Sequence, residues 1–135
     1  MRIVLDTNVL LTSFSSRSDN HWVWKALSES RFTLYLTHDI LLEYEEIIIR
    51  HAGAVLANAV IDALLDLPNV VLIQRYYRWN LIHNDPDDNK FVDCVVAAQA
   101  HYLVSQDRHF SVLNEEEFPY IKVIDFITFR EVLDM

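Results

Sequence analysis

The sequence predicts an α/β fold, a three-layer α/β/α sandwich with a parallel sheet of about five strands. Short apolar runs rich in β-branched residues alternate along the chain with longer stretches of helical periodicity, which is typical of a parallel sheet covered on both faces. The chain has 135 residues, enough for one hydrophobic core. The sequence contains no repeat, low-complexity tract or Gly/Ser linker, so a single domain over residues 1–135 is expected.

The predicted strands are short runs of Val, Ile, Leu, Tyr and Thr, the residues that favour a buried sheet. They cover residues 2–5, 33–37, 70–73, 102–105 and 121–124. The predicted helices carry apolar residues at helical spacing. They cover residues 20–30, 40–51, 54–67, 87–100 and 126–133. Ligands of open parallel sheets bind beyond the carboxyl ends of the strands, so that edge is where functional residues are sought.

Composition excludes several classes of protein. Eleven basic and 20 acidic residues give a net charge of −9, which argues against non-specific coating of nucleic acid but not against nucleic-acid chemistry assisted by a divalent cation. The only glycine is Gly53. A dinucleotide-binding fingerprint, a phosphate-binding P-loop and a G-x-S-x-G nucleophile elbow each need more than one glycine, so none can be built here.

The single cysteine, Cys94, allows no intrachain disulfide and no cysteine-based zinc cage. Its apolar neighbours predict a buried, inert thiol. No apolar run reaches the roughly 18 residues of a membrane span, and the N-terminus lacks the layout of a signal peptide. A cytoplasmic location without membrane contact is therefore expected.

Acidic residues gather at the predicted carboxyl edge of the sheet. They are Asp6 after the first strand, Glu43 in the helix after the second, Asp88 and Asp93 in the helix before the fourth, and Asp107 after the fourth strand. Taken singly, each acid near a helix start is more often a cap than a ligand; Asp85-Pro86, for example, is a good helix start. Taken together, converging carboxylates destabilise the fold unless a cation neutralises them.

Two of these assignments remain open on sequence pattern alone. Periodicity favours Glu45 as the buried acid of its helix, whereas Glu43 lies nearer the helix start and hence nearer the edge. On the next acidic helix Asp88 ranks before Asp93. Asp93 lies on an apolar helix about 7.5 Å further along the axis, so it needs a partner, a metal or partial exposure.

Carboxylate oxygens select hard cations, so the predicted cofactor is Mg²⁺ or Mn²⁺. The chemistry that uses such ions is phosphoryl transfer, in which the metal activates a water molecule and steadies the leaving oxygen. Zinc is not expected, because the six histidines are scattered and show no H-E-x-x-H spacing. No constellation supports a serine or cysteine nucleophile.

Four motifs in order, V-L-D-T-N-V-L at 4–10, L-L-E-Y at 41–44, D-P-D-D-N-K-F at 85–91 and L-V-S-Q-D at 103–107, resemble the PIN domain. The branch that the chain resembles is that of the PIN-family toxins of bacterial toxin–antitoxin systems, which are related to VapC-type ribonucleases. The resemblance spans most of the chain. It implies Mg²⁺- or Mn²⁺-dependent cleavage of RNA, an antitoxin as protein partner and a homodimer.

The resemblance also carries roles to individual residues. It assigns the catalytic and metal-binding quartet to Asp6, Glu43, Asp88 and Asp107, with Asp93 supplementing or replacing Asp88 as a metal ligand. Asn8 and Ser105 match the supporting polar positions. The chain departs from the family at Ser105-Gln106-Asp107, where T-G-D is more usual, and at Gln99, where glycine is common.

One segment interleaves basic and aromatic residues, and it includes Arg75, Arg78 and Trp79. Such a segment suits stacking and phosphate contact with single-stranded RNA, and these three residues are candidate substrate-binding residues. The alternative, which we favour, is a loop whose aromatic side chains cover the sheet. Trp22 and Trp24 belong to the core, to a dimer face or to an antitoxin groove.

The leading hypothesis is a metal-dependent endoribonuclease, the toxin of a toxin–antitoxin pair. A catalytically silent PIN-fold binding module is the alternative from a different class. A phosphohydrolase with Asp6 as covalent nucleophile, as in haloacid-dehalogenase enzymes, is a third, but that family expects a second aspartate at the position of Asn8.

Overall fold

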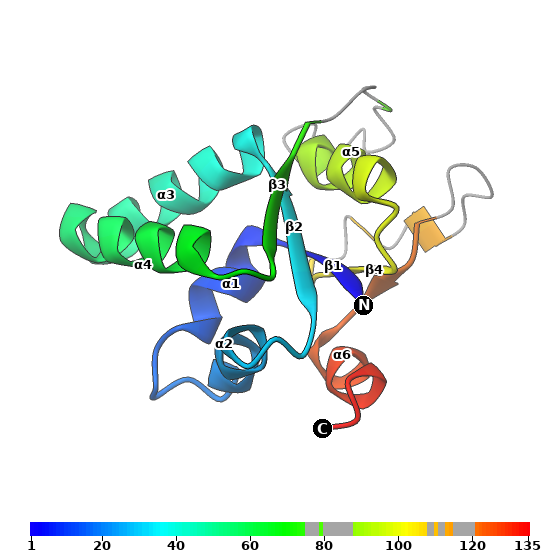
Figure 1. Ribbon diagram of the computed structural model, residues 1–135, viewed down its shortest axis with the longest axis horizontal. Coiled ribbons are helices and arrows are strands. Elements are labelled where there is room, and N and C mark those ends of the chain that lie inside the picture. Colours follow the sequence, from blue (N-terminus) through cyan, green and yellow to red (C-terminus); the bar gives the residue numbers. More distant parts are fainter. Residues whose placement is uncertain (75–78, 80–87, 108–109, 111–112, 115–120) are drawn as a thin grey trace.

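The computed structural model describes residues 1–74, 79, 88–107, 110, 113–114 and 121–135. Its centre is a five-stranded sheet in the order β3-β2-β1-β4-β5, in which every pair of neighbouring strands is parallel (Figure 1). The strands are β1 (Arg2–Leu5), β2 (Thr33–Thr37), β3 (Val70–Ile73), β4 (Tyr102–Val104) and β5 (Val123–Ile124). The predicted parallel α/β fold is confirmed.

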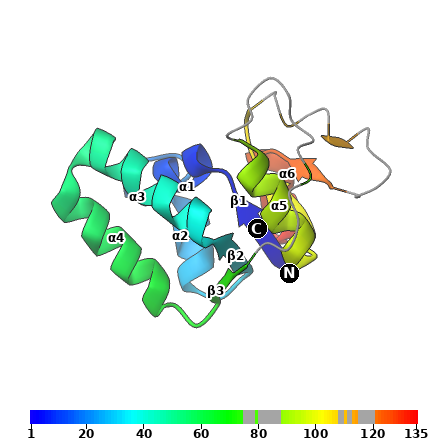
Figure 2. The ribbon, with the colours of Figure 1, turned by 90° about the horizontal axis from the view of Figure 1, so that it is seen from above.

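Six helices of the described residues surround this sheet. They are α1 (Thr7–Ser13), α2 (His21–Ser28), α3 (His38–Ala52), α4 (Ala54–Asp66), α5 (Asn89–Ala98) and α6 (Phe126–Val132). Helix α5 covers one face and contacts β1, β2 and β4. On the other face Trp22 of α2 packs against Phe126 and Phe129 of α6. The antiparallel pair α3–α4 extends from the side of the sheet (Figure 2).

Strand order creates a switch point beside β1. The chain passes from β1 to β2 and β3 on one side, then returns through α5 to β4 on the other side of β1. Leu5 and Val104, the last residues of β1 and β4, are register partners. The Asp6 N–H donates to the Val104 carbonyl oxygen at 3.0 Å. The residues that follow the two strands therefore begin side by side at the carboxyl edge.

Several predicted bounds need correction. Helix α1 was not predicted, because Thr7, Val9 and Thr12 are β-branched in a run of seven residues and give a weak helical signal. The last strand holds Val123 and Ile124 instead of 121–124, and the fourth ends at Val104 instead of at 105. The helix predicted over 87–100 is Asn89–Ala98. The other predicted helices differ by one or two residues at their ends, as helix termini commonly do.

Two of the residues with positive φ lie between elements of the site-bearing part of the fold, Gly53 between α3 and α4 and Gln99 between α5 and β4. Gly53, at φ +88°, is the single residue between α3 and α4, and its N–H donates to the Ile49 carbonyl oxygen. Gln99, at φ +50°, ends α5 before β4. An L-residue in this conformation is sterically strained, so the position of Gln99 is one that favours glycine. Within the described residues, no helix is both long and apolar enough to cross a membrane.

Candidate metal and active site

Asp6 lies at the switch point with its carboxylate largely withdrawn from water. Its side chain is 6% exposed, and its Oδ2 accepts a hydrogen bond from Ser105 Oγ at 2.8 Å. The pKa of Asp6 is raised from 3.8 to about 6, chiefly by burial and to a smaller extent by the negative charges of Asp107 and Glu43. The hydrogen bonds from Ser105 and from the Thr7 backbone act in the opposite direction. Asp6 is thus a carboxylate whose charge the fold leaves under-compensated.

Helix α3 brings Glu43 to the same edge. Glu43 Oε2 accepts a hydrogen bond from Thr7 Oγ1, and Lys90 Nζ lies 2.7 Å from Glu43 Oε1. The side chains of Glu43 and Lys90 are both about one-fifth exposed. This placement agrees with the choice of Glu43 over Glu45 made from its position near the helix start. Both carboxylate oxygens of Glu43 are therefore oriented by neighbouring side chains.

The residue after Glu43 fastens the end of β1 from behind. Tyr44 is fully buried, and its hydroxyl donates to the Leu5 carbonyl oxygen. Burial raises the pKa of Tyr44 well above its usual value, so the hydroxyl stays protonated as a donor. Adjacent residues of α3 thus hold the residues on either side of Asp6, Leu5 through Tyr44 and Thr7 through Glu43. This clamp fixes where the Asp6 carboxylate lies.

Asp107 reaches the edge from the segment after β4. Its backbone N–H donates to Ser105 Oγ at 2.9 Å, so the hydroxyl of Ser105 links Asp6 to the backbone of Asp107. Asp6 and Asp107 line one pocket of about 300 Å³. Asn8 also lines this pocket. The structure thus brings together four of the sequence-predicted residues: Asp6, Asn8, Ser105 and Asp107.

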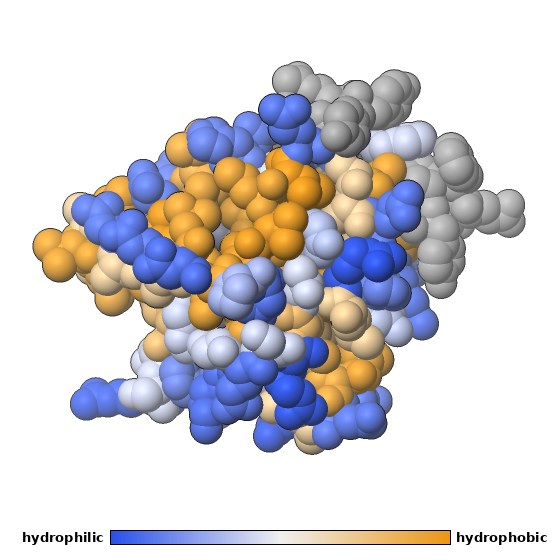
Figure 3. Space-filling model, in the orientation of Figure 1, coloured by the Kyte–Doolittle hydropathy of each residue, from blue (hydrophilic) through white to orange (hydrophobic). Residues whose placement is uncertain are grey.

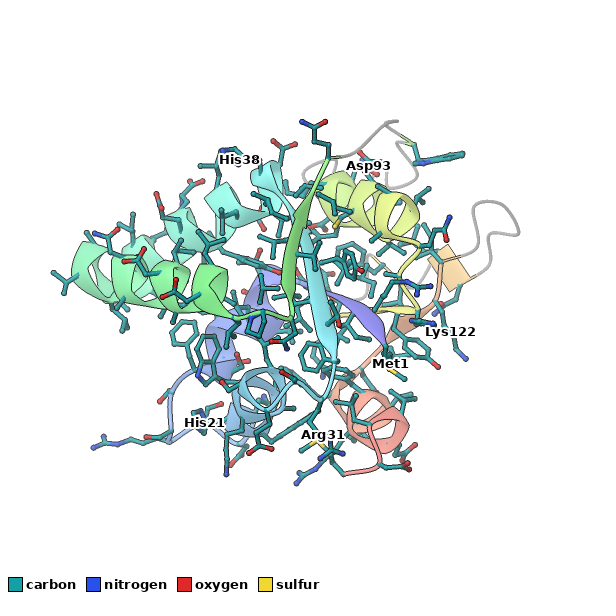
Figure 4. All side chains as sticks on the ribbon, viewed as in Figure 1. Met1, His21, Arg31, His38, Asp93 and Lys122 are labelled. Carbon is teal, nitrogen blue, oxygen red and sulfur yellow. The ribbon has the colours of Figure 1, made fainter. Side chains whose placement is uncertain are left out.

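The two candidates on α5 differ in position. Asp88 is half-buried and immediately precedes the helix, two residues before Lys90, which contacts Glu43. Asp93 is 2% exposed, and its Oδ1 accepts a hydrogen bond from the Trp79 backbone N–H at 2.9 Å. A buried acid needs a hydrogen-bond partner, and the backbone of Trp79 supplies part of what Asp93 needs. In Figure 4, Asp93 and His38 lie toward one end of the molecule and Arg31 toward the other, so Asp93 shares the end where β2 leads into α3.

The helix starts show which acids act as caps. Asp125 caps α6 by accepting from the Thr128 N–H, and Thr37 caps α3 by accepting from the Ile40 N–H. Asp6 and Asp88 occupy the equivalent positions before α1 and α5, yet neither side chain makes a capping hydrogen bond. Side-chain capping therefore does not account for these two residues, and Asp85-Pro86, the helix start that the sequence suggested before α5, lies outside the described residues.

The predicted substrate segment is only partly described. Arg75 and Arg78 lie outside the described residues. Trp79 is half-buried and packs against the core, which agrees with the alternative that the aromatic side chains cover the sheet. Trp22 packs within the molecule against α6, and Trp24 against Phe14. Cys94 is buried, as predicted, and burial raises the pKa of its thiol to about 12.

The donor atoms at this edge suit a hard cation. All the candidate side chains are oxygen donors, and a cation near Asp6 and Asp107 would offset the like charges that raise the Asp6 pKa. Within the described part of the chain, no three Asp, Glu, His or Cys side chains converge as a ready-made metal site. The fit therefore rests on the pocket shared by Asp6 and Asp107, with Glu43 beside it in contact with Thr7 and Lys90.

Sequence reasoning missed three residues of this site. Thr7 and Tyr44 form part of the clamp, and Lys90 supplies a positive charge at the acidic edge. Their neighbours gave the available signal, since each stands next to or two positions from a predicted acid: Asp6, Glu43 and Asp88. Which atoms these side chains would reach depends on how α1, α3 and α5 pack together.

The chain is a parallel α/β/α domain with carboxylates at the switch point of its sheet. Residues 2–109 match the family model of the PIN domain, and the chain belongs to this family. A chain in the crystal structure of VapBC2 from Rickettsia felis bound to a DNA fragment from their promoter has the same fold, with a TM-score of 0.63 and 14% identity. That match covers 93% of this chain and 98% of the other. No curated protein matches the sequence.

Proposed function

We propose that this protein is a metal-dependent endoribonuclease that hydrolyses phosphodiester bonds of RNA, and that it is the toxin of a toxin–antitoxin pair. The observation that carries the proposal is Asp6, a buried carboxylate at the switch point whose pKa is raised to about 6. Perturbed carboxylates in a pocket at this edge are characteristic of catalytic sites, not of caps. Membership of the PIN-domain family supports the same reading.

Asp6 and Asp107 would hold Mg²⁺ or Mn²⁺ in their shared pocket, with Glu43 and Asp88 completing the acidic set. The chemistry that such an ion supplies is a lowered pKa for a water ligand and charge neutralisation at the phosphate. Ser105 keeps Asp6 oriented and favours its ionised form by donating a hydrogen bond. Thr7 and Lys90 orient Glu43, and Tyr44 holds the backbone before Asp6. Asp93 remains a proposed supplementary ligand, and Arg75, Arg78 and Trp79 proposed substrate contacts.

The experiment that tests this proposal is a titration of Mn²⁺ and of Mg²⁺ into wild-type protein and into Asp6→Asn. Heat release reports binding, and cleavage of a structured RNA pool reports activity. We expect saturable binding and cleavage in the wild type and loss of both in the variant. Partner binding without metal binding or cleavage would instead favour the catalytically silent module.

We further propose that an antitoxin protein covers an apolar surface on α3, α4 and β3. Six exposed large apolar side chains lie on these elements, and Figure 3 shows apolar residues over this part of the molecule. We call these residues the α3–α4 apolar surface: Leu42, Ile49, Val55, Leu56, Leu65 and Leu72. An apolar patch on a water-facing surface is typical of a protein-binding site.

A double variant, Val55→Lys with Leu65→Lys, tests this surface. Both side chains are exposed, so the fold should survive, and we expect loss of co-purification with the co-expressed antitoxin. Ile127→Lys is the matched control, because Ile127 is equally apolar and 72% exposed but lies on α6. Retained association in the double variant would place the antitoxin elsewhere.

A further inference from the structure

The pocket beside Asp6 and Asp107 extends beyond the carboxylates into a wall of a different kind. Four elements contribute to this wall: Asn8 from α1, Asn20 from the start of α2, Gln106 from the segment after β4, and Phe126 from the start of α6. We call these four residues the amide wall. The lining of the pocket thus combines the two carboxylates of the proposed chemistry with three amides and one aromatic ring, and Val9 and Thr12 complete it.

The amide wall does not suit a phosphate group. None of the described residues that line the pocket is basic, and Asp6 and Asp107 would repel an anion. Primary amides instead offer both hydrogen-bond donors and acceptors without charge. A neutral ligand whose edge carries donors and acceptors is the chemical complement of this wall.

Two of the amides differ in how the fold uses them. The side chain of Asn20 is not used for capping, whereas the side chain of Gln106 is oriented by a hydrogen bond. Asn20 stands at the N-cap of α2, where asparagine usually caps, yet its side chain makes no capping hydrogen bond and lines the pocket instead. Gln106 Oε1 accepts a hydrogen bond from the Phe126 backbone N–H at 3.0 Å. This bond fixes the amide plane of Gln106 and leaves its NH₂ group as a donor.

Phe126 gives the pocket an aromatic side. Its backbone is held by Gln106, and its ring packs edge-on against Trp22, with the ring centres 6.5 Å apart. The ring is therefore positioned before any ligand arrives, which lowers the entropy cost of stacking on it. A volume of about 300 Å³ is at the lower end for small-ligand pockets and admits one small ring system.

We propose that the amide wall binds one unpaired nucleobase of the substrate, stacked on Phe126 and hydrogen-bonded by Asn8, Asn20 and Gln106. Single-stranded RNA is commonly recognised in this way, by an aromatic platform together with polar contacts to the base edge. The inference rests on the proposed nuclease function, because the bound base would lie next to the phosphate that the nuclease cleaves. It makes these four residues the determinants of which nucleotide lies beside the cleaved bond.

Neutral nucleosides provide the test, because they carry no phosphate and need no metal. Adenosine, guanosine, cytidine and uridine are titrated into the full ¹⁵N-labelled chain, with D-ribose as the control ligand. We expect the side-chain amide signals of Asn8, Asn20 and Gln106 to shift with a nucleoside and not with ribose. Shifts with ribose alone, or shifts confined to other residues, would overturn the proposal.

Variants of the platform sharpen this test. Phe126→Leu keeps an apolar side chain against Trp22 but removes the aromatic face, and we expect nucleoside affinity to fall about tenfold. Phe126→Tyr should retain the affinity. Ile127→Ala is the matched control, because Ile127 is the next residue on α6 and does not line the pocket. Equal affinity in Phe126→Leu and wild type would overturn the stacking role.

Asn20→Ala tests the hydrogen bonds separately from the ring. We expect this variant to change the order of affinities among the four nucleosides, since one edge contact is lost while stacking remains. An unchanged order would remove Asn20 from the wall. Nucleoside binding without RNA cleavage would overturn the nuclease and keep the base pocket, whereas cleavage without nucleoside binding would do the reverse.

Discussion

Asp6 and Asp125 occupy the same local setting, yet the fold gives them opposite properties. Each directly follows a strand of the parallel sheet and directly precedes a helix. Asp125 is exposed, accepts the Thr128 N–H at 2.8 Å, and has its pKa lowered by that hydrogen bond. Asp6 is buried, makes no capping hydrogen bond, and has its pKa raised to about 6 by burial.

The position of the strand in the sheet explains this difference. Asp125 follows β5, which lies at the edge of the sheet, so water reaches its carboxylate. Asp6 follows β1, the central strand, and has Ser105 from the neighbouring β4 segment and the charges of Asp107 and Glu43 around it. The comparison teaches that a strand–aspartate–helix junction is a cap at the rim and a candidate ligand at the switch point.

The largest expected difference between the two aspartates is in catalysis. Asp6→Asn should lower the metal-dependent cleavage of RNA by more than about a hundredfold, because even the loss of an outer partner of a metal ligand costs 10–100-fold. Asp125→Asn should cleave as the wild type does, since asparagine also caps a helix. Single-turnover cleavage rates at saturating Mn²⁺ measure both. Equal losses of cleavage rate in the two variants would contradict the distinction between a ligand at Asp6 and a cap at Asp125.

The second difference is in stability as a function of pH. Asp6 ionises near 3.8 in the unfolded chain and at about 6 in the folded protein, so between these values the folded state holds more protons and its stability falls as pH rises. Asp6→Asn removes this penalty. The free energy of unfolding of Asp6→Asn minus that of the wild type should therefore be about 2 kcal/mol higher above pH 7 than at pH 4.

Urea denaturation in EDTA at several pH values measures this gain, with Asp125→Asn as the reference variant. A stability difference between Asp6→Asn and wild type that does not change with pH would contradict the raised pKa. The expected result also implies that the proposed metal site destabilises the fold, because the wild type keeps a buried charge there at neutral pH.

A smaller effect is expected from the hydrogen-bond partners of the two carboxylates. Ser105→Ala removes the donor to Asp6 Oδ2, so the pKa of Asp6 should rise further and the midpoint of the pH–rate profile should move to higher pH. Thr128→Ala, at the partner of Asp125, should leave that profile unchanged. Profiles of cleavage against pH at fixed Mn²⁺ decide between these outcomes, and a downward shift in Ser105→Ala would be inconsistent with the hydrogen-bond assignment.

The smallest expected effect is the loss of the α6 cap. Asp125→Ala should destabilise the fold by about 1 kcal/mol at pH 7, the usual contribution of an N-cap. Because the folded pKa of Asp125 is lowered, its contribution is present above the unfolded pKa of about 3.8 and is lost as the pH falls through the lowered value. Urea denaturation at pH 7 and at pH 3 should therefore show a larger difference from wild type at pH 7.

The fold was largely predictable because its strands are strongly apolar and separated by helical runs. The bounds of β1, β2 and β3 agree with the predicted ranges. Helix α1 was missed, since its β-branched residues favour a strand locally and its packing against α2 and α3 stabilises it. Local propensity thus identifies an element well only where tertiary contacts agree with it.

The sequence predicted at which edge of the sheet the site lies, but not which side chains contact one another there. Asp6 and Asp107 were placed together because both follow parallel strands, a rule that needs no side-chain detail. The hydrogen bond of Glu43 with Thr7, and its ion pair with Lys90, depend on the packing of three helices. Periodicity alone preferred Glu45, because it records only which face of a helix is apolar.

The sequence by itself determined the parallel α/β architecture and the acidic residues of its carboxyl edge, since apolar periodicity and strand ends are local features. Only the tertiary structure decided that Asp6 is buried, that Asp125 is a cap and that Glu43 has a lysine beside it. The physical reason is that the desolvation and Coulomb energies of a carboxylate depend on neighbours brought from distant parts of the chain. Asp6 and Asp125 have similar local settings, and their places in the sheet separate them.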